Sequence, residues 1–445
     1  MKIRLFFCVT LFILIASNSK AQPEEGVLAV STNDFLNSLG VCTSVSRRGE
    51  SLGETIESMK YTGLRWVRVG YEDNAPVTDF ITLYKKTGVK SSYGLLSGGA
   101  NIDRLLSEAK ELAKSGALLA FEGANEPNNW GVTYQGEKGG AKLSWLPVAK
   151  LHRDLYQAVK KDPALKDYPV WSTCENGAQT DNVGLQFLTI PEGANTLMPD
   201  GTVYADYANC HNYVAHPNLR TLIDNQTWLA SSPSKDCPVD GLYGNYGRTW
   251  LNKYQGYSEE ELLSLPRVTT ETGYAIDEEK GVDEELQARL FLNLYLSQFK
   301  RGWKHTAVYL LKGRSNEPQH EKYAFFTLEN KPKKAAHYMH NFTSILADKG
   351  QLSKPGVLNY SIKEQPKTTH DLLLQKSNGN FMLILWAEKF ESKVPDNIMV
   401  DLGTKYKRVN VYDPTKGSKI TQELKNINSL KLSLLDSPLI IEIIK

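Results

Sequence analysis

Two glutamates stand where strand-like runs end, and their positions suggest acid–base chemistry. Glu126 lies in FEGANEPNNW (121–130), where an apolar run leads into Asn-Glu-Pro and then into a polar loop. Glu271 lies in VTTETG (268–273), at the end of another such run. Asn and Pro also mark ordinary turns, so Asn-Glu-Pro alone is a weak motif. Two carboxylates that face each other across a pocket are what glycoside hydrolysis requires, one as acid and one as nucleophile or base.

Further polar side chains stand at the ends of other strand-like runs. In parallel α/β barrels the catalytic groups gather at the carboxyl ends of the strands, so these residues are candidates for the same pocket. Arg68 comes from the second run and Asn125 from the fourth, while the fifth and sixth supply two residues each. These are Glu175 and Asn176, then His211 and Tyr213.

Eight apolar runs alternate with helical patterns or long loops, which predicts a (β/α)₈ barrel or a doubly wound sheet. The helical pattern after the first run begins with a capping box at Ser51 and Glu54 and ends at Gly63. Eight units favour the barrel, and the first strand–helix turn lacks the Gly-x-Gly-x-x-Gly of a dinucleotide-binding sheet. The expected strands are 39–45, 64–71, 89–96, 117–127, 168–176, 204–214, 265–275 and 304–311.

The pattern changes after Gly350. Short alternating runs separated by turns, with no helical period, predict a β-sandwich over residues 351–445. The first two runs flank an Asn-Gly turn at 378–379, a strong hairpin signal. The barrel is therefore expected over residues 22–350, as the catalytic domain.

The first 21 residues have the features of a secretory signal peptide. A basic MKIR precedes an apolar run and a small-residue site, which places the cut after Ala21. We expect an exported protein, periplasmic or extracellular, without membrane attachment after cleavage. Export permits disulfides, and Cys210 with Cys237 is the favoured pair, although buried thiols are an equal alternative.

Composition excludes several partner classes. The formal net charge is +2, so nothing indicates binding to nucleic acid or to an anionic membrane. The Gly-rich GVTYQGEKGG (131–140) lacks the Gly-Lys-Ser/Thr of a phosphate-binding loop. Cysteine and histidine spacings match no common metal site, so we expect neither a metal nor a cofactor. The oligomeric state is left open.

The constellation resembles clan A of the glycoside hydrolases, the retaining "4/7" superfamily. The resemblance rests on the strand-four Asn-Glu-Pro, the strand-seven Glu, the strand-two Arg and the strand-six His-x-Tyr. The stretches LRWVRVGY, FEGANEPNN and PLIIEI look closest to the branch that holds β-xylosidases and iduronidases. The resemblance covers the chain from about Leu39 onward. Its motifs are specific as a set, but each motif alone is weak evidence.

The resemblance implies a role for each site residue. Glu126 would be the acid/base and Glu271 the nucleophile, with Arg68 and Tyr213 beside Glu271. Asn125 would bind the sugar 2-hydroxyl, and His211 would orient Glu126 or Tyr213 unless it is simply a packed barrel histidine. The substrate would be an oligosaccharide or polysaccharide, with cleavage expected at the end of the chain. A non-catalytic sugar-binding relative and a transglycosidase are the alternatives.

Aromatic side chains in the loops after strands four and six are candidates for stacking on sugar, although each alone is more often a packing residue. Lys312 and Arg314 follow strand eight, where many relatives carry a different motif. Solvated loop charges are the favoured interpretation for them, with recognition of an acidic sugar as the alternative. The aromatic candidates are Trp130, Tyr134, Trp145, Trp228, Tyr243, Tyr246 and Trp250.

Overall fold

The computed structural model describes residues 26–71, 75–96, 98–99, 101–174, 188–214, 222–231 and 259–445 of the 445-residue chain. Eight parallel strands form one sheet, and each coincides with one of the eight predicted runs. They are β3 (Leu39–Cys42), β4 (Trp66–Val69), β5 (Lys90–Gly94), β6 (Leu118–Glu122), β9 (Val170–Trp171), β10 (Ala208–Asn209), β11 (Arg267–Thr272) and β12 (Trp303–Val308).

The sheet closes on itself as a barrel. Its strand order is β10-β11-β12-β3-β4-β5-β6-β9, and a parallel bridge from Trp171 to Tyr207 joins the two ends. The predicted (β/α)₈ fold is therefore confirmed. Because all strands run the same way, their carboxyl ends meet at one mouth.

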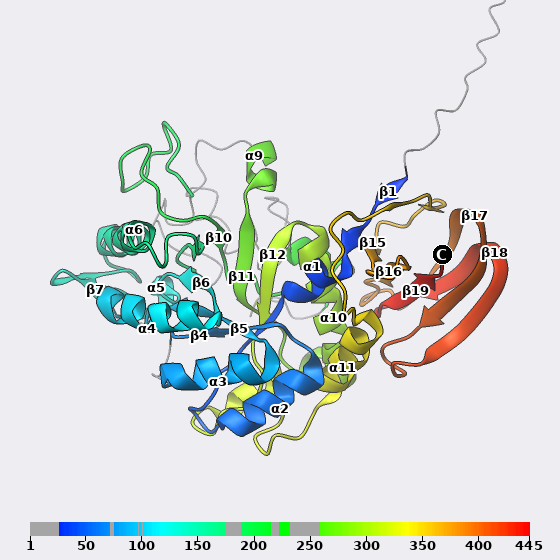
Figure 1. Ribbon diagram of the computed structural model, residues 1–445, viewed down its shortest axis with the longest axis horizontal. Helices are drawn as coiled ribbons and strands as arrows, with labels where there is room; N and C mark the ends of the chain where they lie inside the picture. The colour runs from blue at the N-terminus through cyan, green and yellow to red at the C-terminus, as the bar shows by residue number, and fades with distance from the viewer. Residues whose placement is uncertain are drawn as a thin grey trace, which may run out of the picture.

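Helices surround the barrel where the apolar periodicity places them (Figure 1). In α2 the predicted capping box of Ser51 and Glu54 is present, and Gly63 ends the helix in the left-handed conformation at φ 70°. The longer helices are α2 (Leu52–Thr62), α3 (Val77–Thr87), α4 (Ile102–Ser115), α6 (Leu146–Lys161), α10 (Glu284–Lys300) and α11 (Lys334–Leu346). The shorter ones are α1 (Thr32–Asn37), α5 (Pro127–Trp130), α7 (Gln226–Ala230) and α9 (Glu259–Ser264).

Large side chains fill the barrel interior. Trp66 and Trp171 are both buried and pack edge to face with ring centroids 5.5 Å apart, and His305 packs against both. The interior is a packed core, which leaves the mouth as the place where polar groups can meet a ligand.

A second domain follows the barrel, and the predicted C-terminal β-sandwich is confirmed. Its larger sheet has the order β14-β17-β19-β16-β15-β2, with β18 paired to β17. Its strands are β14 (Ser361–Ile362), β15 (Thr369–Gln375), β16 (Phe381–Ala387), β17 (Asp396–Tyr412), β18 (Ile420–Leu434), β19 (Leu439–Ile443) and, from near the N-terminus, β2 (Val30–Ser31). A small second sheet pairs β1 (Val27–Leu28) with β13 (Val357–Leu358), and a hairpin of β7 (Val132–Tyr134) and β8 (Glu137–Gly139) follows α5.

The sandwich differs from the sequence expectation in one respect. The sequence predicts short strands separated by turns, but the apolar runs at 397–403 and 407–412 both lie in the long β17. The pairing register with β18 shifts between Asp401 and Tyr406, so the residues that resemble a turn form an irregularity in a continuous ribbon.

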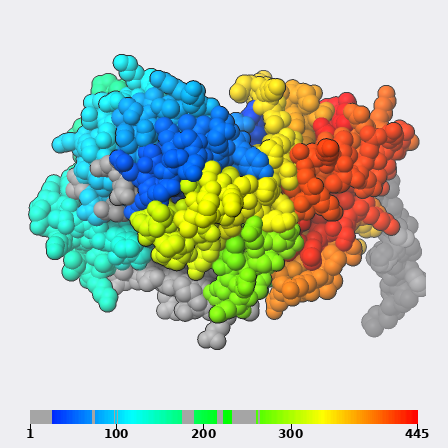
Figure 2. Space-filling model, turned by 90° about the horizontal axis from the view of Figure 1, so that it is seen from below, coloured from blue at the N-terminus to red at the C-terminus, as the bar shows by residue number. Residues whose placement is uncertain are grey.

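The two domains pack closely together. Figure 2 shows the sandwich, in orange and red, lying against the yellow and green parts of the barrel domain. Asn293 of α10 donates to the carbonyl of Asp436, and Asn341 of α11 donates to that of Pro414. Side-chain hydrogen bonds to backbone carbonyls thus cross the contact between the domains.

Four sequence predictions concern residues outside the described ranges. They are the signal peptide of residues 1–21, the partner Cys237 of the expected disulfide, the candidates Glu175 and Asn176, and the aromatic candidates Tyr243, Tyr246 and Trp250. Cys42, Cys174 and Cys210 are all buried. Within the described ranges, no helix combines the length and apolar character needed to cross a bilayer.

Candidate active site

Glu126 stands where the chain breaks away from the barrel wall. A parallel bridge between Asn125 and Cys174 extends the pairing beyond β6, and the Glu126 N–H donates to the Cys174 carbonyl. Glu126 then takes a left-handed conformation, φ 40° and ψ 59°, and Pro127 begins the single turn of α5. A non-glycine residue in this region carries backbone strain, which is common where a site fixes a side chain. The Asn-Glu-Pro sequence therefore serves as a sharp strand-to-helix turn.

Glu271 lies at the end of β11 and is held by two donors from other strands. Arg68 Nη1 donates to Glu271 Oε2 at 2.7 Å, and the Tyr213 hydroxyl donates to Oε1 at 2.6 Å. Both contacts favour the ionised carboxylate. The expectation that Arg68 and Tyr213 lie beside Glu271 agrees with this geometry.

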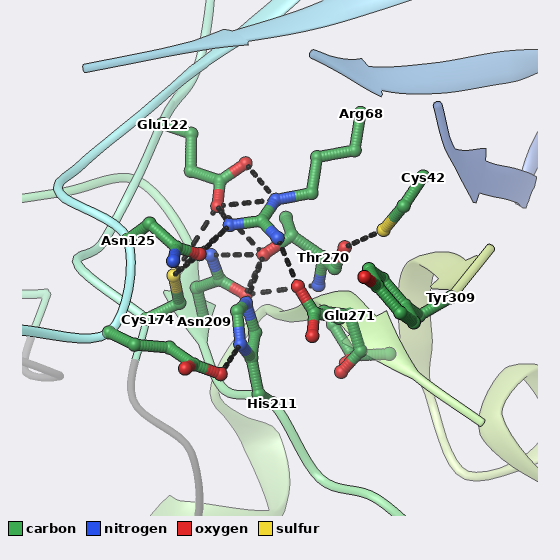
Figure 3. A network of polar contacts seen from close by, with 12 residues as sticks. Cys42, Arg68, Glu122, Asn125, Cys174, Asn209, His211, Thr270, Glu271 and Tyr309 are labelled. Carbon is green, nitrogen blue, oxygen red and sulfur yellow. Dashed lines mark hydrogen bonds and ion pairs between the residues drawn. The ribbon is translucent and has the colours of Figure 1, made fainter. Parts of the chain in front are cut away.

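Arg68 is fully buried, and a second carboxylate balances its charge. Glu122, at the end of β6, receives Arg68 Nη2 at 2.6 Å and Nε at 2.9 Å. Asn125 Oδ1 accepts from the same Nη2 at 2.7 Å, so one guanidinium joins Glu122, Asn125 and Glu271 (Figure 3). The sequence analysis missed Glu122. A glutamate inside an apolar strand is a usable signal, since a buried charge needs a partner.

His211 contacts Glu126, one of the two roles expected for it. Its Nδ1 lies 2.7 Å from Glu126 Oε1, and its Nε2 lies 3.2 Å from the hydroxyl of Thr270. Asn129 Nδ2 donates to the other Glu126 oxygen at 2.8 Å. Glu126 is thus held by a ring nitrogen and an amide, whereas Glu271 is held by a cation and a phenol.

Burial governs the proton affinities at this mouth. It raises the pKa of Glu126, against the weaker opposing effects of Asn129 and Arg68. It also raises the pKa of Glu271, where the charge of Glu126 adds to the effect and Arg68 and Tyr213 oppose it. Burial lowers the pKa of His211 to about 4, so the imidazole is neutral at pH 7. Among the described residues, a guanidinium contacts Glu271 directly and none contacts Glu126.

Two clusters among the described residues contain the donor types that bind metals. Their ligand atoms lie within 4.8 Å of one another: Glu126, His211 and Glu271 in one, Glu122, Cys174 and His211 in the other. Arg68 contacts a carboxylate in each cluster, which disfavours a second cation. Hydrogen bonds within the protein account for both groups.

The two candidate carboxylates differ in exposure from the groups that hold them. Glu126 is 7% exposed and the Glu271 side chain 13%, whereas Arg68, Glu122 and His211 are closed to solvent. A ligand at the mouth can therefore touch the two carboxylates, while the network behind them stays dry.

Trp130 is the exposed aromatic residue near this pair. It ends α5, four residues after Glu126, and 66% of it is accessible. The other described candidates are engaged elsewhere: Tyr134 donates to Asp154, Trp145 is buried, and Trp228 stacks on His370 at 4.0 Å. Tyr243, Tyr246 and Trp250 lie outside the described ranges.

Lys312 and Arg314 are not solvated loop charges, so the favoured interpretation of these residues was wrong. Both are buried. Lys312 Nζ donates to Glu54 at 2.8 Å and to the Gly49 carbonyl, and Arg314 forms an ion pair with Glu317. A basic side chain in a loop can be buried when a carboxylate pairs with it. The partner of Lys312 lies 258 positions away and is not revealed by a local pattern, whereas Glu317 lies three positions after Arg314.

Comparisons with known proteins support the fold. No protein-family model and no curated protein matches this sequence. Among solved structures, a family 39 glycoside hydrolase from the gut symbiont Bacteroides cellulosilyticus WH2 is similar over 93% of this chain and 82% of its own. The TM-score is 0.56 at 16% sequence identity.

Two further solved structures are similar over nearly their whole length. A glucosidase from Croceicoccus marinus has a TM-score of 0.54 at 10% identity, covering 94% of this chain and 97% of its own. An enzyme of glycoside hydrolase family 39 from Xanthomonas axonopodis pv. citri has a TM-score of 0.52 at 12% identity, covering 97% and 99%. At these identities the likeness establishes a shared barrel-and-sandwich architecture.

Proposed function

We propose that the protein is an exported glycoside hydrolase that cleaves sugar bonds with retention of anomeric configuration. Glu271 is the nucleophile and Glu126 the acid/base. The observation that carries this proposal is the pairing of two slightly exposed carboxylates with unlike partners at one barrel mouth. Solved structures of the same architecture include glycoside hydrolases, which agrees with this chemistry.

The separation of the two carboxylates supports retention. Oxygen atoms of Glu126 and Glu271 lie within 4.8 Å of each other. Retaining enzymes hold their carboxyl groups about 5–5.5 Å apart, while inverting enzymes leave about 6.5–9.5 Å for a water molecule. The short distance leaves room for direct attack on the sugar but not for an intervening water.

The partners of each carboxylate suit the proposed roles. Arg68 and Tyr213 stabilise negative charge on Glu271, which must attack the anomeric carbon as an ion. Glu126 has no cation in direct contact among the described residues, and burial favours its protonated form. The acid can therefore give its proton to the leaving oxygen, and its carboxylate then takes a proton from the attacking water.

Substrate class and location complete the proposal. Asn125, fixed by Arg68, binds the sugar 2-hydroxyl through its amide N–H, and Trp130 stacks on the leaving-group side. The enzyme acts on the end of an oligosaccharide or polysaccharide chain. The proposal of export rests on the N-terminal sequence. Identifying the first residue of the secreted protein tests the expected cleavage after Ala21.

The test combines two variants with a stereochemical measurement. Nitrophenyl glycosides and oligosaccharides are screened with wild type, using Glu126→Gln as the blank. Glu271→Ala abolishes turnover and keeps the fold, because the side chain lies at the open mouth. Glu126→Ala slows turnover most for poor leaving groups, and added azide restores part of the rate by attacking the glycosyl-enzyme.

NMR of the first-formed product decides the mechanism. A product with the inverted configuration contradicts these roles even if both glutamates prove essential. Transfer of the sugar to a second sugar in preference to water would identify a transglycosidase. Sugar binding without turnover in the wild-type protein would identify a non-catalytic relative.

A further inference from the structure

A buried hydrogen-bond chain links the Arg68–Glu122 ion pair to Glu126. From Glu122 it passes through the Thr270 hydroxyl and the ring of His211. Figure 3 shows the Thr270 side chain between Glu122 and His211. Every member before Glu126 is buried, so water does not compete for these contacts.

The hydroxyl of Thr270 has one proton to donate and two lone pairs to accept with. Glu122 Oε1 lies 2.9 Å away and belongs to a carboxylate already paired with Arg68, so it is the strongest acceptor in reach. Asn209 Nδ2 donates to Thr270 at 3.0 Å. One lone pair of the hydroxyl then remains, and the ring nitrogen of His211 at 3.2 Å faces it.

The orientation of Asn209 is fixed independently. Its Oδ1 accepts from the Thr270 backbone N–H, and its Nδ2 donates to the carbonyl of Ser172. The amide therefore presents a donor to the Thr270 hydroxyl. With the hydroxyl proton directed to Glu122, the contact with His211 requires an N–H at Nε2.

We infer that Thr270 and Glu122 are positioning residues that fix His211 in its Nε2–H tautomer and thereby hold a proton on Glu126. A neutral imidazole carries one ring proton, so Nδ1 presents a lone pair to Glu126 Oε1. At 2.7 Å the hydrogen bond between them needs a proton, and only Glu126 can supply it. The inference rests on the proposed function, because it explains how the acid keeps its proton.

The relay also assists the second half of the reaction. Once Glu126 has given its proton to the leaving oxygen, its carboxylate faces the Nδ1 lone pair. Uptake of a proton from the attacking water restores the hydrogen bond, while the hydroxide part of that water joins the anomeric carbon and the bond from that carbon to Glu271 breaks, which releases the Glu271 carboxylate. The same arrangement thus makes Glu126 a ready base after it has acted as an acid.

Other titratable groups influence the proton affinities of His211 and Glu126, and the test must leave those groups unchanged. In the described ranges, titratable groups face His211 and Glu126 from β4, β6 and β11 and from the segments after β9 and β10. They are Arg68, Glu122, Glu271, Cys174 and Tyr213. Replacing Thr270 removes none of them, so a change in proton affinity reports on the relay.

The experiment compares Thr270→Val with Thr270→Ser in pH profiles of kcat/KM. Without the hydroxyl, His211 can carry its proton on Nδ1 and donate it to the Glu126 carboxylate. The basic limb, which reports Glu126, should move down by about one to two pH units, while the acidic limb of Glu271 stays in place. Thr270→Ser keeps the hydroxyl and should keep the basic limb at its wild-type position.

Thr269→Val is the matched control on the same strand. Thr269 is buried like Thr270, but its hydroxyl donates to the backbone carbonyl of Glu271. An equal movement of the basic limb in Thr269→Val and Thr270→Val would overturn the inference, as would an unmoved limb in Thr270→Val. A merely structural role would lower the rate at every pH without moving one limb.

Nitrogen-15 NMR of ring-labelled histidine tests the tautomer without any substrate. The wild-type protein should show His211 with its proton on Nε2 at pH 7, assigned by loss of the signal in His211→Gln. A proton on Nδ1 would overturn the inference even if the enzyme proves to be a glycosidase. This spectrum also decides the matter if Thr270→Val fails to fold or if no glycosidase activity is found.

Discussion

Glu388 is a buried carboxyl group between the barrel and the β-sandwich, and its replacement by glutamine tests how pH acts on their contact. It follows β16 and reaches the first turn of α7, where Oε2 accepts from the Thr227 N–H at 2.9 Å. Its other oxygen contacts the hydroxyls of Thr227 and Ser297. Thus one side chain of the sandwich contacts two helices of the barrel domain.

Burial raises the pKa of Glu388 from 4.5 to about 7, although these donors act in the opposite direction. Between those values the folded protein keeps a proton that the unfolded chain releases. The resulting stability is fully present below pH 4.5 and is lost as the pH rises through 7. The interval between the two values corresponds to about 3 kcal/mol of unfolding free energy.

Glu388→Gln imitates the protonated carboxyl, because its amide can accept from the Thr227 N–H and donate to the Thr227 hydroxyl. Urea unfolding followed by circular dichroism at pH 5 and pH 8 measures the effect. Wild type should lose about 3 kcal/mol more than the variant between these two pH values. Other titrating groups are common to both proteins, so they cancel in the comparison.

Glu442→Gln is the matched control in the same domain. Burial acts to raise the pKa of Glu442, but hydrogen bonds from Asn410, Tyr412 and Asn380 outweigh it and the pKa is lowered. Glu442 is therefore ionised throughout this pH range, and its replacement should cost the same at pH 5 as at pH 8. Parallel pH dependences in wild type and Glu388→Gln would refute the reasoning about Glu388.

Two further substitutions test the site. Arg68→Met should destabilise the protein by about 3–5 kcal/mol in urea unfolding, because it leaves Glu122 buried without a partner, and adding Glu122→Gln should recover most of the loss. A double variant that is as unstable as Arg68→Met would contradict the argument that buried Glu122 needs Arg68 as its partner. Trp130→Ala should raise KM about 2–10-fold for oligosaccharides, through loss of about 0.5–1.5 kcal/mol of stacking, and leave the urea midpoint unchanged. Equal KM values in the two proteins would show that Trp130 does not touch the substrate.

The sequence predicts where this site lies because of how parallel barrels are built. A strand buried on both faces reads as a short apolar run, and the polar residue that ends it must lie at the common mouth. Arg68, Glu126, His211 and Glu271 could each be placed in this way. Their proposed roles depend on their contacts with one another, which the sequence does not show. Those roles could be expected only from the resemblance to known glycoside hydrolases.

The residues that sequence reasoning missed act through distant partners. Glu122 is 54 positions from Arg68, and Thr270 is 148 positions from Glu122. Thr270 reads as an ordinary β-branched strand residue, since its type fits the strand whether or not its hydroxyl is used. Lys312 was misjudged for the same reason, because its partner Glu54 lies 258 positions away.

In the proposed mechanism, the network explains how two chemically identical side chains acquire opposite tasks within 4.8 Å. Arg68 contacts Glu271 directly and favours its ionised form, whereas its hydrogen-bonded path to Glu126 runs through Glu122, Thr270 and His211 and its charge opposes the raised pKa of Glu126 only weakly. Each hydrogen bond along that path has a donor and an acceptor. At the end of the path His211 presents a nitrogen lone pair, and not a positive charge, to Glu126. The guanidinium therefore stabilises the anion on Glu271 directly, while in the proposed relay its partner Glu122 helps to hold the proton on Glu126. A direct contact from Arg68 to both carboxylates would make them alike, so the buried path through Glu122 is what divides the acid from the nucleophile.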